Sequence, residues 1–247
     1  MRVNGEVVDK CGTGILLTST IEVKARARFV SRGGEKLSKA LAVFEIATLN
    51  RICLDAGIST GGFTDCLLQA DAKQVYGIDV GYGQVDWKIR TDDRVVLRER
   101  TNIRHLTPVE LYGEPVEGVY PVTLPDLAVV DVSFISAIKI LPALELLLAP
   151  PKELIVLVKP QFEVGKQAIG KNGVVRDLSA QAGAILGVLT AAQSLGWHYR
   201  GLTWSPLVGP AGNIEYLLWL DLVGDELVTT PDLAEIKLLT EAAYQAL

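Results

Sequence analysis

The sequence predicts an α/β fold in which a mostly parallel sheet is covered by helices on both faces. Apolar runs of strand length alternate with runs of helix length from residue 35 to the C-terminus. Strands and helices that alternate at this spacing are typical of parallel sheets with helices on each face. Ligands of such sheets bind beyond the carboxyl ends of the strands, so polar residues at strand ends indicate where a site lies.

The expected elements follow the apolar pattern. Apolar residues at 37, 40, 41 and 44 predict an amphipathic helix from Glu35. Strands are expected at 51–57, 74–80, 94–100, 126–132, 153–160 and 212–222. Further helices are expected at 62–70, 137–148 with a kink or restart at Pro142, 173–196, and from 231 to the end. Before them, two short strands predict a small N-terminal module that ends near Arg28.

Length and composition exclude several classes of protein. The 247 residues suit one sizeable domain with a small appendage. Charged residues interrupt each apolar run before membrane-spanning length, so no transmembrane helix is expected. The N-terminus lacks the apolar core of a secretory signal and the three cysteines form no CxxC pair, which favours a reducing cytoplasm. The two histidines lack ligand-like neighbours, so no metal site is expected.

A basic segment covers residues 24–39 although the net charge of the chain is −5. It contains Arg26, Arg28 and Arg32, and in the predicted helix Lys36 falls in the first turn. A solvated linker and helix face is the commoner origin of such a run. A lysine in the first turn opposes the helix dipole, however, so Lys36 is expected to have a function there.

The glycine-rich segment LDAGISTGGFTD, residues 54–65, predicts a cofactor loop. A strand ends at Asp55, and Gly57 begins a glycine spacing that differs from the GxGxxG of nicotinamide sites. Asp79 ends the next strand, 79 − 57 = 22 residues after that glycine, where an acid commonly binds ribose hydroxyls. The loop and the acid together favour an adenosyl cofactor. Asn102 follows the third strand and is either an adenine contact or a turn or helix-cap residue.

Four further charged residues are expected at the same end of the sheet. Asp131 and Lys159 each follow an apolar strand, and Pro160 prevents the second strand from continuing. If the last strand is antiparallel, it brings Glu215 to this end, where Lys36 would complete a Lys-Asp-Lys-Glu set. Two salt bridges that close the sheet edge are the simplest interpretation of any one pair. Four such groups from separate segments favour catalysis, with one lysine neutral enough to accept a proton.

A series of motifs resembles the TlyA family of ribosomal RNA 2′-O-methyltransferases, which are relatives of the FtsJ-type fold. The motifs occur in the family's order: FVSRGGEKL, LDAGISTGGFTD, DVGYGQVDWKIR, ERTNIRHL, VVDVSFIS, LVKPQFEVGK, NGVVRD and GNIEYLLWL. The resemblance implies a Rossmann-like class I methyltransferase sheet of seven strands with an antiparallel last strand. It also implies S-adenosylmethionine as cofactor and a cytidine ribose in ribosomal RNA, free or within a subunit, as target.

The resemblance assigns roles to individual residues. Lys36, Asp131, Lys159 and Glu215 correspond to the catalytic tetrad. Gly61, Phe63, Asp79 and Asn102 correspond to cofactor contacts, and Asp55, Gly57, Ser59 and Gly62 of the same loop complete the expected cofactor site. Arg26, Arg28, Arg32, Lys166, Lys171 and Arg176 are expected to contact RNA phosphates. The residues DVSF after the fourth strand of the main domain differ from the Asp/Asn-Pro-Pro-aromatic loop of amine-directed enzymes, which favours an oxygen acceptor.

The N-terminus departs from the family pattern. Residues 1–27 resemble the trailing strands of an S4 RNA-binding module whose helices are missing from this sequence, and residues 28–247 form the expected methyltransferase domain. Two alternatives remain: a catalytically impaired RNA-binding homologue, and a membrane-active haemolysin, a label that this family often carries. The haemolysin has little physical support, because the final helix is net acidic and no charge-free segment could span a bilayer.

Overall fold

The computed structural model describes residues 1–10, 12–22, 27–118, 120–222 and 228–247. Its strands are β1 (Arg2–Val3), β2 (Glu6–Val7), β3 (Ile21–Glu22), β4 (Ile52–Ala56), β5 (Gln74–Ile78), β6 (Val95–Arg98), β7 (Leu127–Val130), β8 (Glu153–Val158), β9 (His198–Trp204) and β10 (Tyr216–Asp221). Its α-helices are α1 (Gly33–Val43), α2 (Gly62–Gln69), α3 (Trp87–Arg90), α4 (Pro108–Tyr112), α5 (Leu141–Leu147), α6 (Pro160–Glu163), α7 (Leu178–Ser194) and α8 (Leu233–Ala246). Short 3-10 turns are η1 (Ile103–His105), η2 (Ala137–Lys139), η3 (Lys166–Ala168) and η4 (Lys171–Gly173).

Seven strands form the main sheet in the order β6-β5-β4-β7-β8-β10-β9. The neighbouring pairs from β6 to β8 are parallel, whereas β10 is antiparallel to both β8 and β9. The chain leaves β4 toward β5 on one side and returns to its other side at β7, so the strand order reverses between β4 and β7. Such a reversal point is where doubly wound sheets bind ligands. The predicted α/β sheet with an antiparallel last strand is confirmed.

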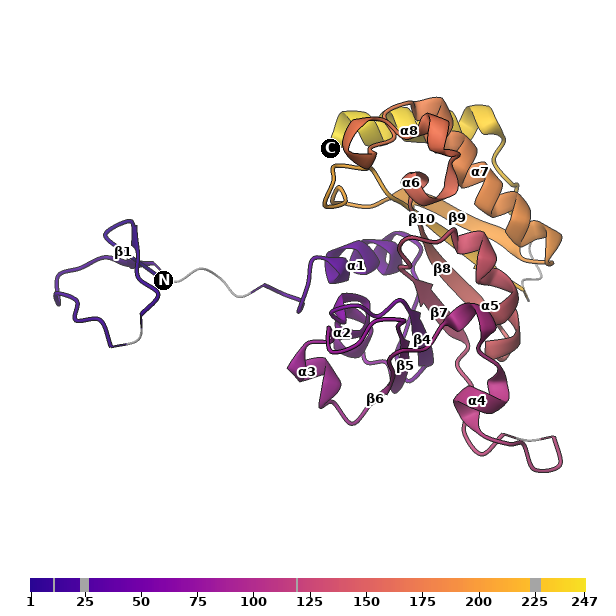
Figure 1. Cartoon of the computed structure of the whole chain (residues 1–247), viewed down its shortest axis with the longest axis horizontal. Helices are drawn as coiled ribbons and strands as arrows, with labels where there is room; N and C mark the ends of the chain where they lie inside the picture. Colours follow the sequence, from indigo (N-terminus) through magenta and orange to yellow (C-terminus); the bar gives the residue numbers. More distant parts are fainter. Residues whose placement is uncertain (11, 23–26, 119, 223–227) are drawn as a thin grey trace.

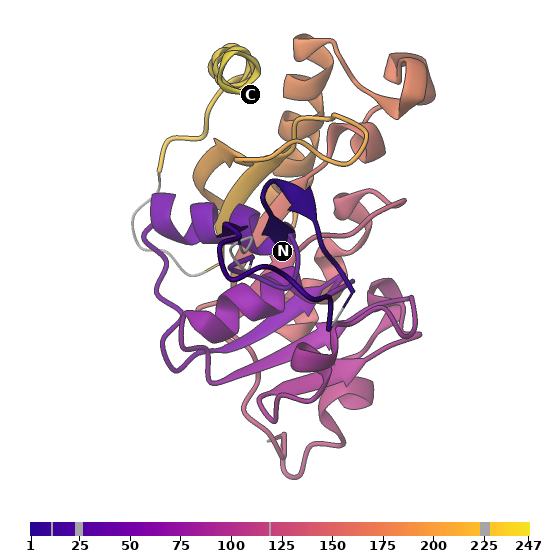
Figure 2. The same cartoon turned by 90° about the vertical axis from the view of Figure 1, so that its left-hand side faces the viewer.

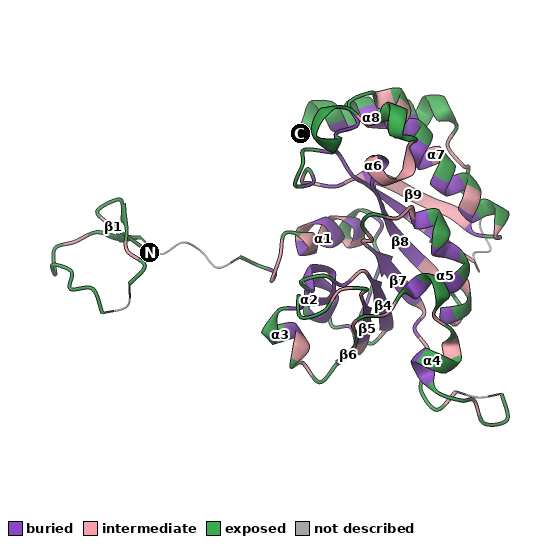
Figure 3. Ribbon diagram, in the orientation of Figure 1, coloured by how far each residue is buried: buried purple, intermediate pink, exposed green. Residues whose placement is uncertain are grey.

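Helices cover both faces of this sheet (Figure 1). Alternate residues of each strand point to opposite faces, and two apolar cores result. One core packs the sheet against α1, α2 and α3, and the other packs it against α4, α5, α7 and α8. Figure 3 shows the buried strands between the helical layers, whose outer surfaces are exposed. Strands buried on both faces explain the nearly continuous apolar runs in the sequence.

The structure differs from the sequence prediction at several places, among them the short helices α3, α4 and α6, which were not predicted. The edge strand β9 was not predicted, because its sequence HYRGLTW is half-buried and lacks an apolar run. Helix α7 begins at Leu178 rather than 173, because Asp177 caps it by accepting a hydrogen bond from the Ser179 N–H. The N-terminal module has three strands rather than two. At Pro142 the expected restart is confirmed, since η2 ends before α5 begins.

The N-terminal strands form a separate small sheet in the order β2-β1-β3. This sheet lies away from the main sheet, on the side that carries α1 (Figures 1 and 2). Its apolar side chains Val7 and Ile21 are 70% and 50% exposed, so it has no core of its own. Residues 1–22 are therefore an appendage to the domain that contains the site.

Candidate active site

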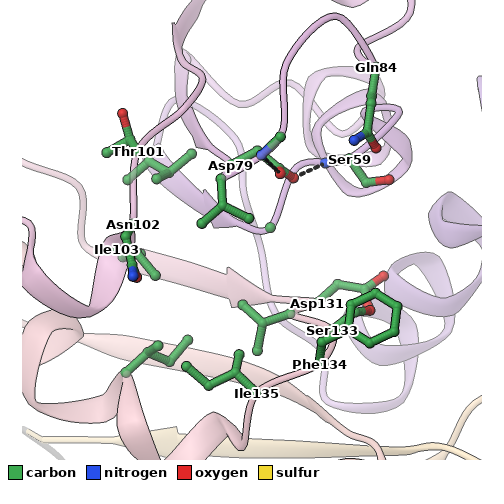
Figure 4. A pocket seen from close by; sticks show the side chains of 16 residues that line it. Ser59, Asp79, Gln84, Thr101, Asn102, Ile103, Asp131, Ser133, Phe134 and Ile135 are labelled. Atoms are coloured by element: carbon green, nitrogen blue, oxygen red, sulfur yellow. Dashed lines mark hydrogen bonds between the residues drawn. The ribbon is translucent and has the colours of Figure 1, made fainter.

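Two neighbouring cavities open at the carboxyl end of the parallel strands. The larger has a volume of about 490 Å³ and lies between the loops after β4, β5 and β6 and the loop after β7. Figure 4 shows Ser59, Asp79 and Asn102 on one wall and Asp131 and Ser133 on the other. The smaller cavity, of about 210 Å³, lies beside α1 and α2. Gly57, Ser59 and Asp131 line both cavities, so Asp131 stands at the boundary between them.

The strand arrangement brings the four predicted tetrad residues to this rim. Tyr216, the first residue of β10, pairs with Val158, the last residue of β8, so Glu215 and Lys159 leave the sheet at the same end. Lys36 from α1 forms an ion pair with Glu215, and Lys159 forms one with Asp131 at 2.6 Å between Nζ and Oδ1.

The two pairs differ in burial. The Lys36–Glu215 pair is almost fully removed from solvent, with exposed side-chain fractions of 11% and 2%. Asp131 is 23% exposed, since it faces the cavities, whereas its partner Lys159 is 9% exposed. Lys159 Nζ also donates a hydrogen bond of 2.8 Å to Ser133 Oγ. The Lys159 amine is therefore fixed by two residues of one loop, within reach of the cavity boundary.

The larger cavity has polar groups suited to an adenosyl cofactor. Asp79 accepts hydrogen bonds from the N–H groups of Ser59 at 2.8 Å and Gly81 at 2.7 Å, one on each carboxylate oxygen. A carboxylate has about four acceptor positions, so both oxygens retain capacity for ribose hydroxyls. Gly57 has a φ of +92°, and a Cβ there would lie 2.7 Å from the Asp131 carbonyl oxygen. Only glycine therefore allows β4 to turn this closely past the loop after β7.

The remaining cofactor predictions divide among three places. Gly62 and Phe63 line the smaller cavity rather than the larger one. Asp55 and Gly61 line neither of the two cavities. Gly61 is the left-handed N-cap of α2, with a φ of +96°. Asn102 lines the larger cavity and also caps η1 by accepting a hydrogen bond from the Arg104 N–H, so the cap is confirmed and the adenine contact stays a prediction.

Asp55 is fully buried beneath the cofactor loop. Its Oδ2 accepts a 2.7 Å hydrogen bond from Thr64 Oγ1, and its Oδ1 has no hydrogen-bond partner among the described residues. Burial raises the pKa of Asp55 to about 7, against the opposing effect of the Thr64 hydrogen bond. The structure thus places Asp55 as a support of the loop rather than on the wall of either cavity.

The predicted RNA contacts are solvent-exposed. Arg28, Arg32, Lys166, Lys171 and Arg176 are all exposed, whereas Arg26 lies outside the described residues. Arg32 also lines the smaller cavity, beside Lys36. In the described part of the chain no group of three or more His, Cys, Asp or Glu residues could hold a metal ion.

Sequence reasoning missed several lining residues. The larger cavity also contains Gln84, Thr101 and Phe134, and the smaller one Ser31 and Pro210. Phe134 belongs to the DVSF segment, which was interpreted for the type of acceptor and not for the cavity wall. The other four lie in loops between strands or before α1, where no residue pattern marks a cavity wall.

These features together define a Rossmann-like methyltransferase. They are a doubly wound sheet with an antiparallel β10, a cofactor-sized cavity where strand order reverses, and two lysine–carboxylate pairs beside that cavity. The comparison with protein families agrees, because the model of the FtsJ-like methyltransferase family matches residues 29–222. The chain belongs to this family, and its cofactor is S-adenosylmethionine.

Relatives match along nearly the whole chain. The 16S/23S rRNA (cytidine-2′-O)-methyltransferase TlyA of Mycobacterium tuberculosis is 44% identical over 237 residues, which cover 95% of this chain and 85% of that protein. Hemolysin A of Brachyspira hyodysenteriae is 40% identical over 215 residues, 87% of this chain and 86% of that protein. A crystal structure of a candidate hemolysin from Lactococcus lactis is 41% identical, with a TM-score of 0.80, and covers 89% of this chain and 100% of that chain.

The residues of the larger cavity fit the cofactor. Its volume of about 490 Å³ falls within the range of small-molecule sites. Asp79 has free acceptor capacity for ribose, and Ile78, Ile103 and Ile140 provide an apolar surface for a base. Among the described residues, no helix is both long and apolar enough to cross a membrane.

Proposed function

We propose that this protein methylates the ribose 2′-hydroxyl of a cytidine in ribosomal RNA. The reaction takes place in the cytoplasm. The observation that carries the proposal is the position of Asp131 and Lys159 at the boundary of a cofactor-sized cavity and a second cavity that contains Lys36 and Arg32. The name and 44% identity of the mycobacterial relative support the ribose and the cytidine.

Bound S-adenosylmethionine supplies a methyl group that is already activated by its sulfonium. The protein therefore has two tasks, to align the acceptor oxygen and to remove its proton. In the proposed mechanism, Lys159 accepts the proton of the 2′-hydroxyl as that oxygen takes up the methyl group. Asp131 and Ser133 orient the Lys159 amine through the contacts described above.

The Lys36–Glu215 pair is assigned to the RNA that carries the acceptor hydroxyl. Lys36 lines the smaller cavity, where its charge stabilises the developing negative charge or holds the neighbouring phosphate. Glu215 orients Lys36 through their ion pair. Arg32 lines the same cavity and is exposed, which suits contact with the RNA backbone.

The RNA contacts extend to both sides of the site in this proposal. Lys166, Lys171 and Arg176 are exposed in the segment between β8 and α7 and are assigned to phosphates. Residues 1–27 are assigned to the trailing part of an S4-type RNA-binding module, on the basis of their sequence and the small three-stranded sheet.

The test is transfer of radiolabelled methyl groups from S-adenosylmethionine to ribosomal subunits that lack the modification, with the product mapped to a nucleoside. Lys159→Ala should lower the rate of transfer by about 10² to 10⁴, the usual contribution of a general base, and leave cofactor affinity nearly unchanged. Substantial transfer by the folded variant would contradict the role of Lys159. Cofactor binding without transfer by the unmutated chain would contradict ribosomal RNA as substrate and favour an impaired homologue.

A further inference from the structure

The loop after β7 forms one whole wall of the larger cavity. Its residues 131–135 all line that cavity. The N–H groups of residues 132–136 make none of the backbone–backbone hydrogen bonds found in the described part of the chain. Phe134 has a φ of +64° and is 92% exposed, and Val132 packs against the core while only partly buried, so core burial alone holds this loop weakly. Its conformation must depend on contacts made by side chains.

In the described part of the chain, the polar and aromatic side-chain contacts between this loop and the rest of the protein come from Lys159 and the four-residue helix α6 that follows it. At the start of the loop, Lys159 binds Asp131 and Ser133. In the middle, the rings of Phe134 and Phe162 have centroids 5.5 Å apart.

At the end of the loop, Glu163 of α6 binds Ser136 and Ala137. Its Oε2 accepts a 2.6 Å hydrogen bond from Ser136 Oγ, and its Oε1 accepts a 2.8 Å hydrogen bond from the Ala137 N–H. The Ser136 hydroxyl in turn caps η2 by accepting from the Ile138 N–H at 3.2 Å. The Ser136 hydroxyl therefore links Glu163 to the start of η2.

The surroundings of Glu163 show that these two bonds are its main interactions. Burial raises the pKa of this carboxyl, and the bonds from Ser136 and Ala137 oppose that effect. Among the described residues no lysine, arginine or histidine forms a salt bridge with Glu163. A carboxylate withdrawn from water without a cation is costly, and here both of its oxygens bind the end of the cavity wall.

We propose that Glu163 is a positioning residue of the active site. It holds the end of the loop after β7 against α6, which fixes the wall of the cofactor cavity and keeps Ser133 and Asp131 in register with Lys159. The part that concerns Lys159 rests on the proposed function, whereas the part that concerns the cavity wall depends only on the cofactor.

The test compares four variants of the full chain by calorimetric titration with S-adenosylmethionine and by single-turnover methyl transfer. Glu163→Ala removes both bonds and should weaken cofactor affinity about tenfold, the scale of one lost hydrogen bond to a charged group, and slow transfer. Glu163→Gln can accept from the Ala137 N–H and donate to Ser136 Oγ, and it should restore affinity to within about threefold. Ser136→Ala removes one bond and should be intermediate.

Glu153→Ala is the matched control. Glu153 is a carboxylate of similar burial at the opposite end of the sheet, where it accepts a hydrogen bond from Trp219 Nε1. Its removal should lower the melting temperature without a change in cofactor affinity.

Three results would overturn the proposal: unchanged affinity of folded Glu163→Ala, a loss in Glu163→Gln as large as in Glu163→Ala, or an equal loss in Glu153→Ala. If Glu163→Ala does not fold, unchanged affinity of Ser136→Ala would overturn it instead. Should the expected affinities be found while no variant, including the unmutated chain, methylates ribosomal RNA, the role of Glu163 in the cavity wall stands and the proposed substrate fails.

Discussion

The two ends of the main sheet both carry paired charges, but only one of them has the two cavities described above. At the carboxyl end, the pairs are Lys36 with Glu215 and Lys159 with Asp131. At the opposite end, Arg51 binds both Asp126 and Glu153, and Arg200 binds Asp221. In each case the partners are at least 21 residues apart in the sequence, and at least one of them lies where a strand begins or ends.

The difference between the two ends shows that an ion pair at a strand end does not by itself indicate a functional site. At the opposite end the pairs join neighbouring strands, since Arg51 precedes β4, Asp126 precedes β7 and Glu153 begins β8. At the carboxyl end the same chemistry adjoins Gly57, which lines both cavities at the point where strand order reverses. Ion pairs next to cavities therefore indicate a catalytic site. Ion pairs alone would indicate only that neighbouring segments are joined at the end of the sheet.

The strongest way to test this contrast is to neutralise the buried pair at the carboxyl end. Lys36→Met combined with Glu215→Gln removes both charges, so that neither is left buried without a partner. We expect a folded protein with cofactor affinity close to that of the unmutated chain, because neither residue lines the larger cavity. Methyl transfer should fall by about 10² to 10³, the scale of a lost electrostatic contact in a transition state. Transfer at the original rate would make this pair equivalent to those at the opposite end.

The second prediction concerns Asp55, a buried acid near the carboxyl end that forms no salt bridge with any described residue. Its pKa is about 7 in the folded protein and about 3.9 when unfolded. Between these values the folded state keeps a proton that the unfolded state has released, so the Asp55 contribution to stability decreases as pH rises and is constant above about 7.

Asp55→Asn removes this titration and keeps an acceptor for Thr64 Oγ1. Between pH 5 and 8 the free energy of unfolding of Asp55→Asn should rise by about 2 to 3 kcal/mol relative to that of the unmutated chain. Urea denaturation at several pH values measures it. Parallel stability curves would show that Asp55 ionises normally.

The smallest expected effect lies at the opposite end of the sheet. Arg51→Ala leaves Asp126 and Glu153 without their cation, and their side chains are 30% and 16% exposed. We expect the free energy of unfolding to fall by about 2 kcal/mol, less than for a fully buried pair, with methyl transfer per folded molecule unchanged. A specific loss of transfer or of cofactor affinity in this variant would show that the opposite end also serves the site.

The sequence predicted the central elements and most of the cofactor loop, because local signals specify both. Six apolar runs indicated six of the seven main strands, and the glycines after β4 indicated a cofactor loop. Edge strand β9 lacked such a run, because apolar and polar residues are mixed along a half-buried strand. Gln84 and Phe134 were missed because a cavity wall imposes shape rather than a pattern of residue types.

Both the sequence and the tertiary structure were needed to locate the tetrad. By itself the sequence determined that Asp131, Lys159 and Glu215 stand at the ends of strands, since each of them bounds an apolar run. Only the tertiary structure decided the partners: the antiparallel register of β10 against β8 places Glu215 near Lys36, and the parallel β7 and β8 place Asp131 beside Lys159. Pairing of this kind depends on which strands are neighbours, a long-range property that no local pattern contains.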